Sequence, residues 1–246
     1  MRQVISSLEN PRVKEVLRLR RSRERRRSGL FVAEGPREVG RALAAGLTAT
    51  AMYHAPAVLA DWPHGGEEVT PRVLAKLSYR AEPEGVVAIF VAPVYAIPPA
   101  ATLVLVAVGI EKPGNLGALA RSADAAGADA LLVADAVTDL WNPNAIRAST
   151  GAVFTLPIVD VTLADVAALP LRRIAAVTGA ETHHTAADLT QPTAILVGAE
   201  DEGLDAPWRA IADVEVSIPM QPRSVDSLNA ATAAAILLFE AVRQRG

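Results

Sequence analysis

Hydrophobic and polar positions divide the chain into two parts with different patterns. From residue 103 onward, short apolar runs alternate with amphipathic stretches. This pattern predicts strands at 103–108, 130–133, 153–159, 173–177, 194–197 and 214–218, and helices at 116–126, 144–149 and 228–244. Continuous apolar runs such as Leu103–Val108 are typical of strands buried on both faces of a parallel sheet. Strands that alternate with helices predict a parallel α/β domain.

The first ninety residues predict a smaller α/β unit. Its expected elements are one helix over 11–28, further helices at 36–45 and 71–78, and strands at 30–35, 50–53 and 85–91. Three prolines within 91–100 indicate a linker. We therefore expect a first domain over 1–92, a linker over 93–101 and a second domain over 102–246.

Charge is distributed unevenly between these parts. Residues 1–50 carry 12 of the 24 Lys and Arg residues but only 5 of the 27 Asp and Glu residues. Such an asymmetry suggests a polyanion-binding end joined to an acidic body. The candidate phosphate contacts are the clustered arginines Arg20, Arg21, Arg23, Arg25, Arg26 and Arg27. The alternative is a solvated charged face.

Several classes of site are disfavoured by what the sequence lacks. Cysteine is absent, which excludes disulfides and thiolate metal sites. The pair His183-His184 has no further ligand at metal spacing, so we expect no metal. Neither a dinucleotide fingerprint nor a P-loop follows any strand. No signal peptide and no apolar run of about 20 residues is present, so we expect a cytoplasmic protein without a membrane segment.

Three strand–loop–helix junctions carry polar side chains beyond those a helix start needs. The first holds Asn115 and Arg121, the second runs from Gly198 to Gly203, and the third holds Ser227 and Asn229. Ligands of open parallel sheets bind at the carboxyl ends of strands, so the three junctions predict one site. The simpler interpretations are helix caps for Ser227 and Asn229 and an ion pair from Arg121 to the residue three positions on.

These three segments resemble the motifs of the SpoU-type, TrmH-like branch of the SPOUT superfamily of RNA 2′-O-ribose methyltransferases. The matching stretches are Asn115-Leu116-Gly117 with Arg121, Gly198-Ala199-Glu200-x-x-Gly203-Leu204, and Ile218-Pro219-Met220 with Ser227-Leu228-Asn229. The resemblance covers about residues 103–243. Residues 1–90 resemble more loosely the family's N-terminal RNA-binding domain, which is similar to small ribosomal proteins. The loop 221–226 is about one residue longer than is common in the family.

The resemblance implies a fold, a cofactor and roles for residues. It implies a deep trefoil knot in the C-terminal parallel-sheet domain, S-adenosylmethionine as cofactor, and a homodimer formed through the catalytic domain. It implies catalytic roles for Arg121, Asn115, Glu200, Ser227 and Asn229. The cofactor would be bound around Thr178, Gly179, Gly198, Ile218, Met220 and Leu228.

The expected reaction is methyl transfer to a ribose 2′-hydroxyl in structured RNA, with 23S ribosomal RNA as the leading target. The sequence leaves open whether the modification is a housekeeping or an antibiotic-resistance methylation. A tRNA target and a non-catalytic RNA-binding factor that retains the fold remain alternatives, and an oxidoreductase is disfavoured. The family's arginine is proposed to accept a proton, but a charged guanidinium has no lone pair for it. We therefore expect Arg121 to stabilise the developing alkoxide and to hold a phosphate.

Overall fold

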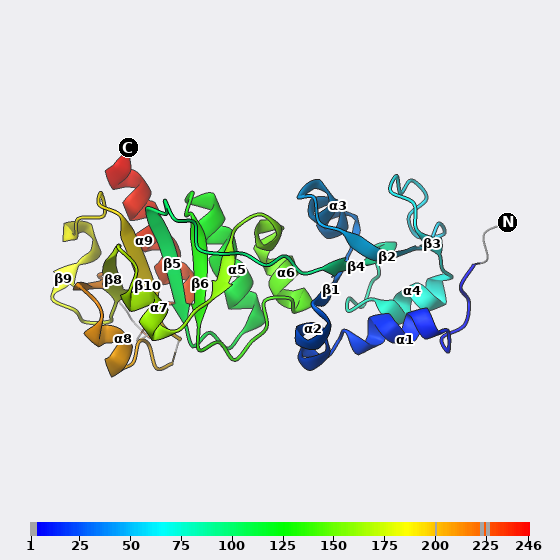
Figure 1. Cartoon of the computed structure of the whole chain (residues 1–246), viewed down its shortest axis with the longest axis horizontal. Coiled ribbons are helices and arrows are strands. Elements are labelled where there is room, and N and C mark those ends of the chain that lie inside the picture. Colours follow the sequence, from blue (N-terminus) through cyan, green and yellow to red (C-terminus); the bar gives the residue numbers. More distant parts are fainter. Residues whose placement is uncertain (1–3, 200, 222–223, 225–226) are drawn as a thin grey trace.

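The computed structural model describes residues 4–199, 201–221, 224 and 227–246. Its elements form two sheets, each with its own helices, which lie at opposite ends of an elongated molecule (Figure 1). The predicted catalytic residue Glu200 and four positions of the loop 221–226 lie outside the described residues.

The N-terminal sheet is mixed and has the strand order β1-β4-β2-β3. Its strands are β1 (Leu30–Glu34), β2 (Ala49–His54), β3 (Glu67–Glu68) and β4 (Val86–Val91). Its helices are α1 (Pro11–Arg18), α2 (Ser22–Ser28), α3 (Pro36–Ala44) and α4 (Pro71–Leu77). Alternate residues of a strand point to opposite faces. Accordingly, Val32 packs in the core beneath α1 and α4, whereas Phe31 joins the core shared with the C-terminal part.

The prediction of one continuous helix over 11–28 is wrong. Helix α1 ends at Arg18 and α2 begins at Ser22. Leu19, between them, is only 4% exposed. The side chain of Arg25 folds back and donates hydrogen bonds to the carbonyl oxygens of Leu19 and Arg20, at 2.6 and 2.9 Å. These bonds supply donors to two backbone carbonyls at the break between the helices. In a continuous helix the same carbonyls would accept from backbone N–H groups of the next turn.

The C-terminal sheet has seven strands, all parallel, in the order β7-β6-β5-β10-β8-β11-β9. The strands are β5 (Leu103–Val108), β6 (Ala130–Ala134), β7 (Ile158–Asp160), β8 (Arg172–Ala176), β9 (Thr182–His183), β10 (Thr193–Val197) and β11 (Val214–Ser217). The helices are α5 (Pro113–Ala125), α6 (Pro143–Ser149), α7 (Leu163–Ala167), α8 (Ala206–Ala210) and α9 (Ala230–Arg245), with 3₁₀ turns η1 (Ala152–Phe154) and η2 (His184–Ala186). This arrangement confirms the predicted α/β class.

Helices bury both faces of this sheet, as the apolar runs predicted. Alternate residues of β5 pack against α5 and α9 on one face, and the residues between them pack against α7 and α8 on the other. Every residue of β5 and β10 is buried. The predicted strand over 153–159 is wrong in its first part: residues 152–154 form η1, because Gly151 adopts a φ of +101° and turns the chain, and β7 begins only at Ile158.

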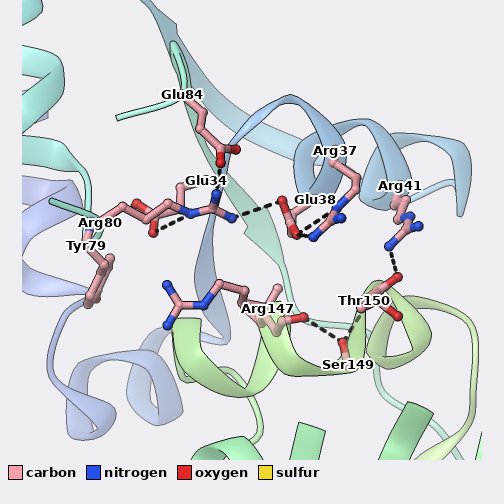
Figure 2. A network of polar contacts seen from close by, with 12 residues as sticks. Glu34, Arg37, Glu38, Arg41, Tyr79, Arg80, Glu84, Arg147, Ser149 and Thr150 are labelled. Carbon is pink, nitrogen blue, oxygen red and sulfur yellow. Dashed lines mark hydrogen bonds and ion pairs between the residues drawn. The ribbon is translucent and has the colours of Figure 1, made fainter. Parts of the chain in front are cut away.

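The two parts meet through a packed interface that includes α2, β1 and α6 (Figure 1). The ring of Phe31 stacks on Trp141, with 4.3 Å between ring centroids, and lies 5.9 Å from the ring of Phe154. Arg41 on α3 donates a hydrogen bond to the carbonyl oxygen of Thr150 just after α6, as Figure 2 shows. The interface therefore combines aromatic packing with directional polar contacts.

Candidate active site at the carboxyl edge of the sheet

The predicted motif segments follow four strands that are neighbours in the sheet. The order β5-β10-β8-β11 brings together the carboxyl ends of these strands, although they are dispersed along the sequence. Asn115 follows β5, Gly198 follows β10, Thr178 follows β8, and Ile218 follows β11. Parallel strands end at the same edge, which is where ligands of open α/β sheets bind.

A pocket of about 410 Å³ opens at this edge. Five of the six predicted cofactor-binding residues line it: Thr178, Gly198, Ile218, Met220 and Leu228. The predicted catalytic residue Ser227 lines it as well. The sixth, Gly179, is exposed and is not among the lining residues. The size lies within the range typical of small-molecule sites.

The pocket wall that includes Gly198 and Gly203 depends on glycine. Ala199 and Gly203 form an antiparallel bridge, and the backbone N–H of Gly203 donates to the carbonyl of Ala199 at 2.9 Å. A Cβ atom on Gly198 would lie 2.1 Å from the carbonyl carbon and oxygen of Gly203. Only glycine therefore permits this close approach of backbone to backbone.

Two predicted catalytic residues lie in direct contact beside the pocket. Asn115 is in the first turn of α5, and Asn229 is the N-cap of α9. The Nδ2 of Asn229 donates to Oδ1 of Asn115 at 3.3 Å, and its own Oδ1 accepts from the backbone of Ala231 at 3.0 Å. Asn229 thus caps α9 and also contacts Asn115 of the first junction. The Nδ2 atom of Asn115 is buried and has no hydrogen-bond partner among the described residues.

Arg121 lies on α5, as predicted, and is exposed. The alternative of an ion pair with Asp124 is not seen, and Arg121 makes no ion pair to any residue that the structure describes. The structure does not join Arg121 to Asn115, Ser227 or Asn229 by a hydrogen bond.

The sequence interpretation missed several pocket residues. Asp201 and Glu202 line the pocket, and so does Arg209 from α8. Arg209 makes a bidentate contact with Glu215 of β11, at 2.7 and 2.8 Å. Its hydrogen bonds lower the pKa of Glu215 and raise that of Arg209. The two residues are six positions apart, but neither belongs to the three motif segments on which the sequence interpretation rested.

The six N-terminal arginines are in different environments. Arg21, Arg23 and Arg26 are exposed, and Arg27 is exposed while pairing with Glu24. Arg20 donates to the carbonyls of Lys76 and Ser78, both at 2.8 Å, at the end of α4.

Arg25 has to be removed from the candidate RNA contacts. Its side chain is only 3% exposed and is paired with Asp139. A guanidinium buried in this way cannot reach a phosphate.

Neither a metal site nor a membrane segment is visible in the described ranges. Among these residues, no cluster of three His, Cys, Asp or Glu side chains is placed to hold a metal ion. Within the same ranges, every helix is too short or too polar to cross a bilayer.

Comparison with known proteins gives consistent matches. Residues 102–239 match the SpoU rRNA Methylase family, and residues 10–88 match the MRM3-like substrate binding domain. A solved RNA 2′-O ribose methyltransferase superposes with a TM-score of 0.85 at 42% identity, covering 99% of both chains. The SpoU methyltransferase AviRb from Streptomyces viridochromogenes, in complex with the cofactor AdoMet, superposes with a TM-score of 0.86 at 31% identity, covering 96% of this chain and 98% of that one.

A curated relative from the same organism is 46% identical over 143 residues, which are 54% of this chain. It is named 23S rRNA (uridine(2479)-2′-O)-methyltransferase, and the match spans only half of its length.

Proposed function

Because the chain belongs to the SpoU rRNA methylase family, we propose that it transfers a methyl group from S-adenosylmethionine to a ribose 2′-oxygen of 23S ribosomal RNA. The observation that carries the proposal is the pocket at the carboxyl edge, where residues of the second and third motifs meet beside Asn115. A relative of the same fold binds the same cofactor.

The residues of the pocket fit S-adenosylmethionine. The pocket is lined by apolar residues such as Ile218, Met220 and Leu228 together with Thr178 and Gly198. Apolar walls with a few placed polar groups are typical of cofactor sites. When bound, the cofactor supplies an electrophilic methyl group. The family's trefoil knot, formed by the chain around this pocket, belongs to the same proposal.

A neutral hydroxyl is a poor nucleophile, so the protein must stabilise the charge that develops on the 2′-oxygen. Arg121 is suited to this role because it is exposed, uncompensated by any described acidic partner and positively charged at all physiological pH values. A charged guanidinium donates but does not accept hydrogen bonds. Arg121 therefore stabilises the oxyanion and holds a neighbouring phosphate.

The remaining polar residues orient the ribose. Asn229 holds the side chain of Asn115 through its amide, which leaves the buried Nδ2 of Asn115 as a fixed donor. Ser227 is exposed at the pocket and contributes a hydroxyl. For Glu200, which lies outside the described residues, the proposed role is to hold its loop or to complement positive charge. Fixed donors and acceptors reduce the entropy lost when reactants are aligned.

The N-terminal domain, 1–92, joined by the linker 93–101 to the catalytic domain 102–246, binds the RNA. The exposed arginines of its basic segment neutralise phosphates, which makes the affinity strongly dependent on salt. We further propose a cytoplasmic homodimer formed through the catalytic domain. Phe239 and Val242 on α9 are 49% and 38% exposed and offer an apolar surface for the second copy.

The test is transfer of labelled methyl groups to unmodified 23S ribosomal RNA and to tRNA, followed by mapping of the modified ribose. Calorimetry with S-adenosylmethionine and with NAD accompanies it. Failure to bind S-adenosylmethionine would refute the proposal. Cofactor binding without transfer to either RNA would instead favour a non-catalytic RNA-binding factor. Modification of tRNA alone would show that the substrate is tRNA and not 23S ribosomal RNA. Antibiotic-resistance assays would distinguish a housekeeping methylation from one that confers resistance.

A further inference from the structure

A buried ion pair joins the arginine-rich helix to the catalytic domain. The Nε and Nη2 atoms of Arg25 lie 2.7 and 2.6 Å from Oδ2 of Asp139, and the two side chains are 3% and 7% exposed. The remaining amino group of Arg25 binds the carbonyls of Leu19 and Arg20. Arg25 therefore fixes the turn between α1 and α2 and anchors α2 on the loop that follows β6.

This anchor sets the direction of the exposed arginines. Residues two positions apart on a helix project about 200° from each other. Arg23 and Arg27 therefore project away from the face on which Arg25 contacts Asp139, and both are exposed. The ion pair thus determines where α2 presents its positive charge relative to the catalytic domain.

The loop that holds Asp139 is also attached to the wall of the cofactor pocket. At its start, Asp135 has a φ of +52° and accepts a hydrogen bond of 3.1 Å from Nε1 of Trp208. Trp208 is 2% exposed in α8, beside the pocket residue Arg209. At its end, Oδ1 of Asp139 accepts from the backbone of Trp141, which stacks on Phe31 of β1.

One short loop therefore connects the pocket wall to the N-terminal domain. Asp135, at the start of this loop, has a left-handed conformation. At a residue other than glycine such a conformation persists only where its surroundings impose it.

On the basis of the proposed function, we propose that Arg25 and Asp139 are positioning residues for the RNA substrate. They fix the distance between the phosphate-binding arginines of α2 and the ribose site at Asn115, and so determine which nucleotide is methylated. A buried ion pair often adds little net stability compared with apolar packing, but loss of one partner leaves an uncompensated charge. The directional hydrogen bonds of this ion pair are suited to fixing the orientation of α2 relative to the catalytic domain.

Three variants of the full-length protein test this role. Asp139→Asn removes the charge and keeps the shape. The double variant Arg25→Met/Asp139→Leu replaces the pair by apolar packing. Arg23→Met is the matched control, because it makes the same change in the same helix at an exposed position.

We expect Arg23→Met to weaken RNA binding and to reduce the salt slope by about 0.7–0.9, with an unchanged modified nucleotide. Asp139→Asn keeps its cofactor affinity and salt slope. Its turnover falls by about 100-fold, as misplacement of reactants by about 1 Å can cause, and methyl groups shift to neighbouring nucleotides. The double variant leaves no buried charge uncompensated and recovers stability, but it lacks the directional contacts of both side chains, so its turnover stays reduced and its methyl groups stay shifted.

A measurement that does not depend on activity accompanies these assays. The chain has no cysteine, so spin labels at Val58→Cys and Ala164→Cys, both exposed, report the distance between the two domains. We expect a narrow distance distribution in the labelled parent and broad ones with Asp139→Asn and with the double variant, because both lack the ion pair. The double variant also carries the test if Asp139→Asn fails to fold.

Normal transfer by the parent, together with an unchanged site map and a narrow distance distribution in Asp139→Asn, would overturn the positioning role alone. A salt slope in the double variant that falls as in Arg23→Met would also overturn it, because Arg25 would then be acting on phosphate. Absence of methyl transfer by the parent itself would instead refute the proposed function.

Discussion

The side-chain amide of Asn229 donates a hydrogen bond of 3.3 Å to Oδ1 of Asn115, although the two residues are 114 positions apart in the sequence. The bond ties the first turn of α5 to the N-cap of α9 and thereby holds two of the three motif segments together. The same side chain caps α9 through its oxygen. Its two functions can be separated by substitution.

Asn229→Ser should separate the cap from the contact. Serine caps a helix about as well as asparagine, but its hydroxyl is too short to reach Asn115. We expect unfolding free energy within about 0.5 kcal/mol of the parent and turnover reduced at least about tenfold. Asn229→Ala should show the same kinetic defect and lose about 1 kcal/mol more stability. Denaturant titration and methyl-transfer kinetics measure both. Full activity in the serine variant would contradict a role for the Asn115 contact.

Arg121→Lys tests whether charge alone is sufficient for catalysis. Lysine keeps the positive charge but lacks the planar fork that can bind an oxyanion and a phosphate together. We expect turnover to fall by about 10²–10³, the usual cost of removing an oxyanion donor, and Arg121→Ala to fall at least as far. Cofactor affinity by calorimetry should stay within twofold in both, since Arg121 does not line the pocket. Near-normal turnover of Arg121→Ala at saturating RNA would exclude the role.

Gly198→Ala should damage the cofactor pocket specifically. The added methyl group would lie 2.1 Å from backbone atoms of Gly203, so the loop has to move. We expect the Kd for S-adenosylmethionine to rise by at least about tenfold, a loss of about 1.4 kcal/mol. Gly127→Ala is the matched control, because no atom lies within 4 Å of its added Cβ and only its φ of +69° opposes the change. It should lose some stability and keep its affinity. Equal affinities of the two variants would contradict this assignment.

Glu240 near the end of α9 should make the fold sensitive to acid. Hydrogen bonds from Arg243, and then from Gln244, lower the pKa of Glu240 to about 2. A carboxylate whose pKa is depressed in the folded state contributes stability above its unfolded pKa and loses it as pH falls toward the folded value. The difference in Tm between the parent and Glu240→Gln should therefore be largest at pH 7. It should decrease toward zero as the pH falls from 4.5 to 2. Thermal melts across this range measure it, and a constant difference would argue against the assignment.

The strands β5, β6 and β10 could be predicted because burial on both faces makes them continuously apolar, as in Leu103–Val108. Residues 152–154 have a similar composition but form a 3₁₀ turn. There Phe154 packs near Phe31, and this contact lies outside any local window.

The polar site was predictable to a similar extent. Residues within motifs, such as Gly198 and Ile218, line the pocket, whereas Arg209 lies outside the motifs and reaches the pocket only because the fold places α8 there. The burial of Arg25 has the same cause. In the sequence it is one arginine among six, and only the fold places it opposite Asp139.

The strand order has a consequence for how the chain folds. Strand β8 pairs with β10 and β11, both of which come later in the sequence, and it has no contact to β5 in the sheet. During synthesis, β8 therefore has unpaired edges until residues 193–197 insert between it and β5. Non-local parallel pairing of this kind slows folding and exposes strand edges to aggregation. Cofactor binding should consequently appear late in refolding, only after α9 has closed the edge where Asn229 meets Asn115.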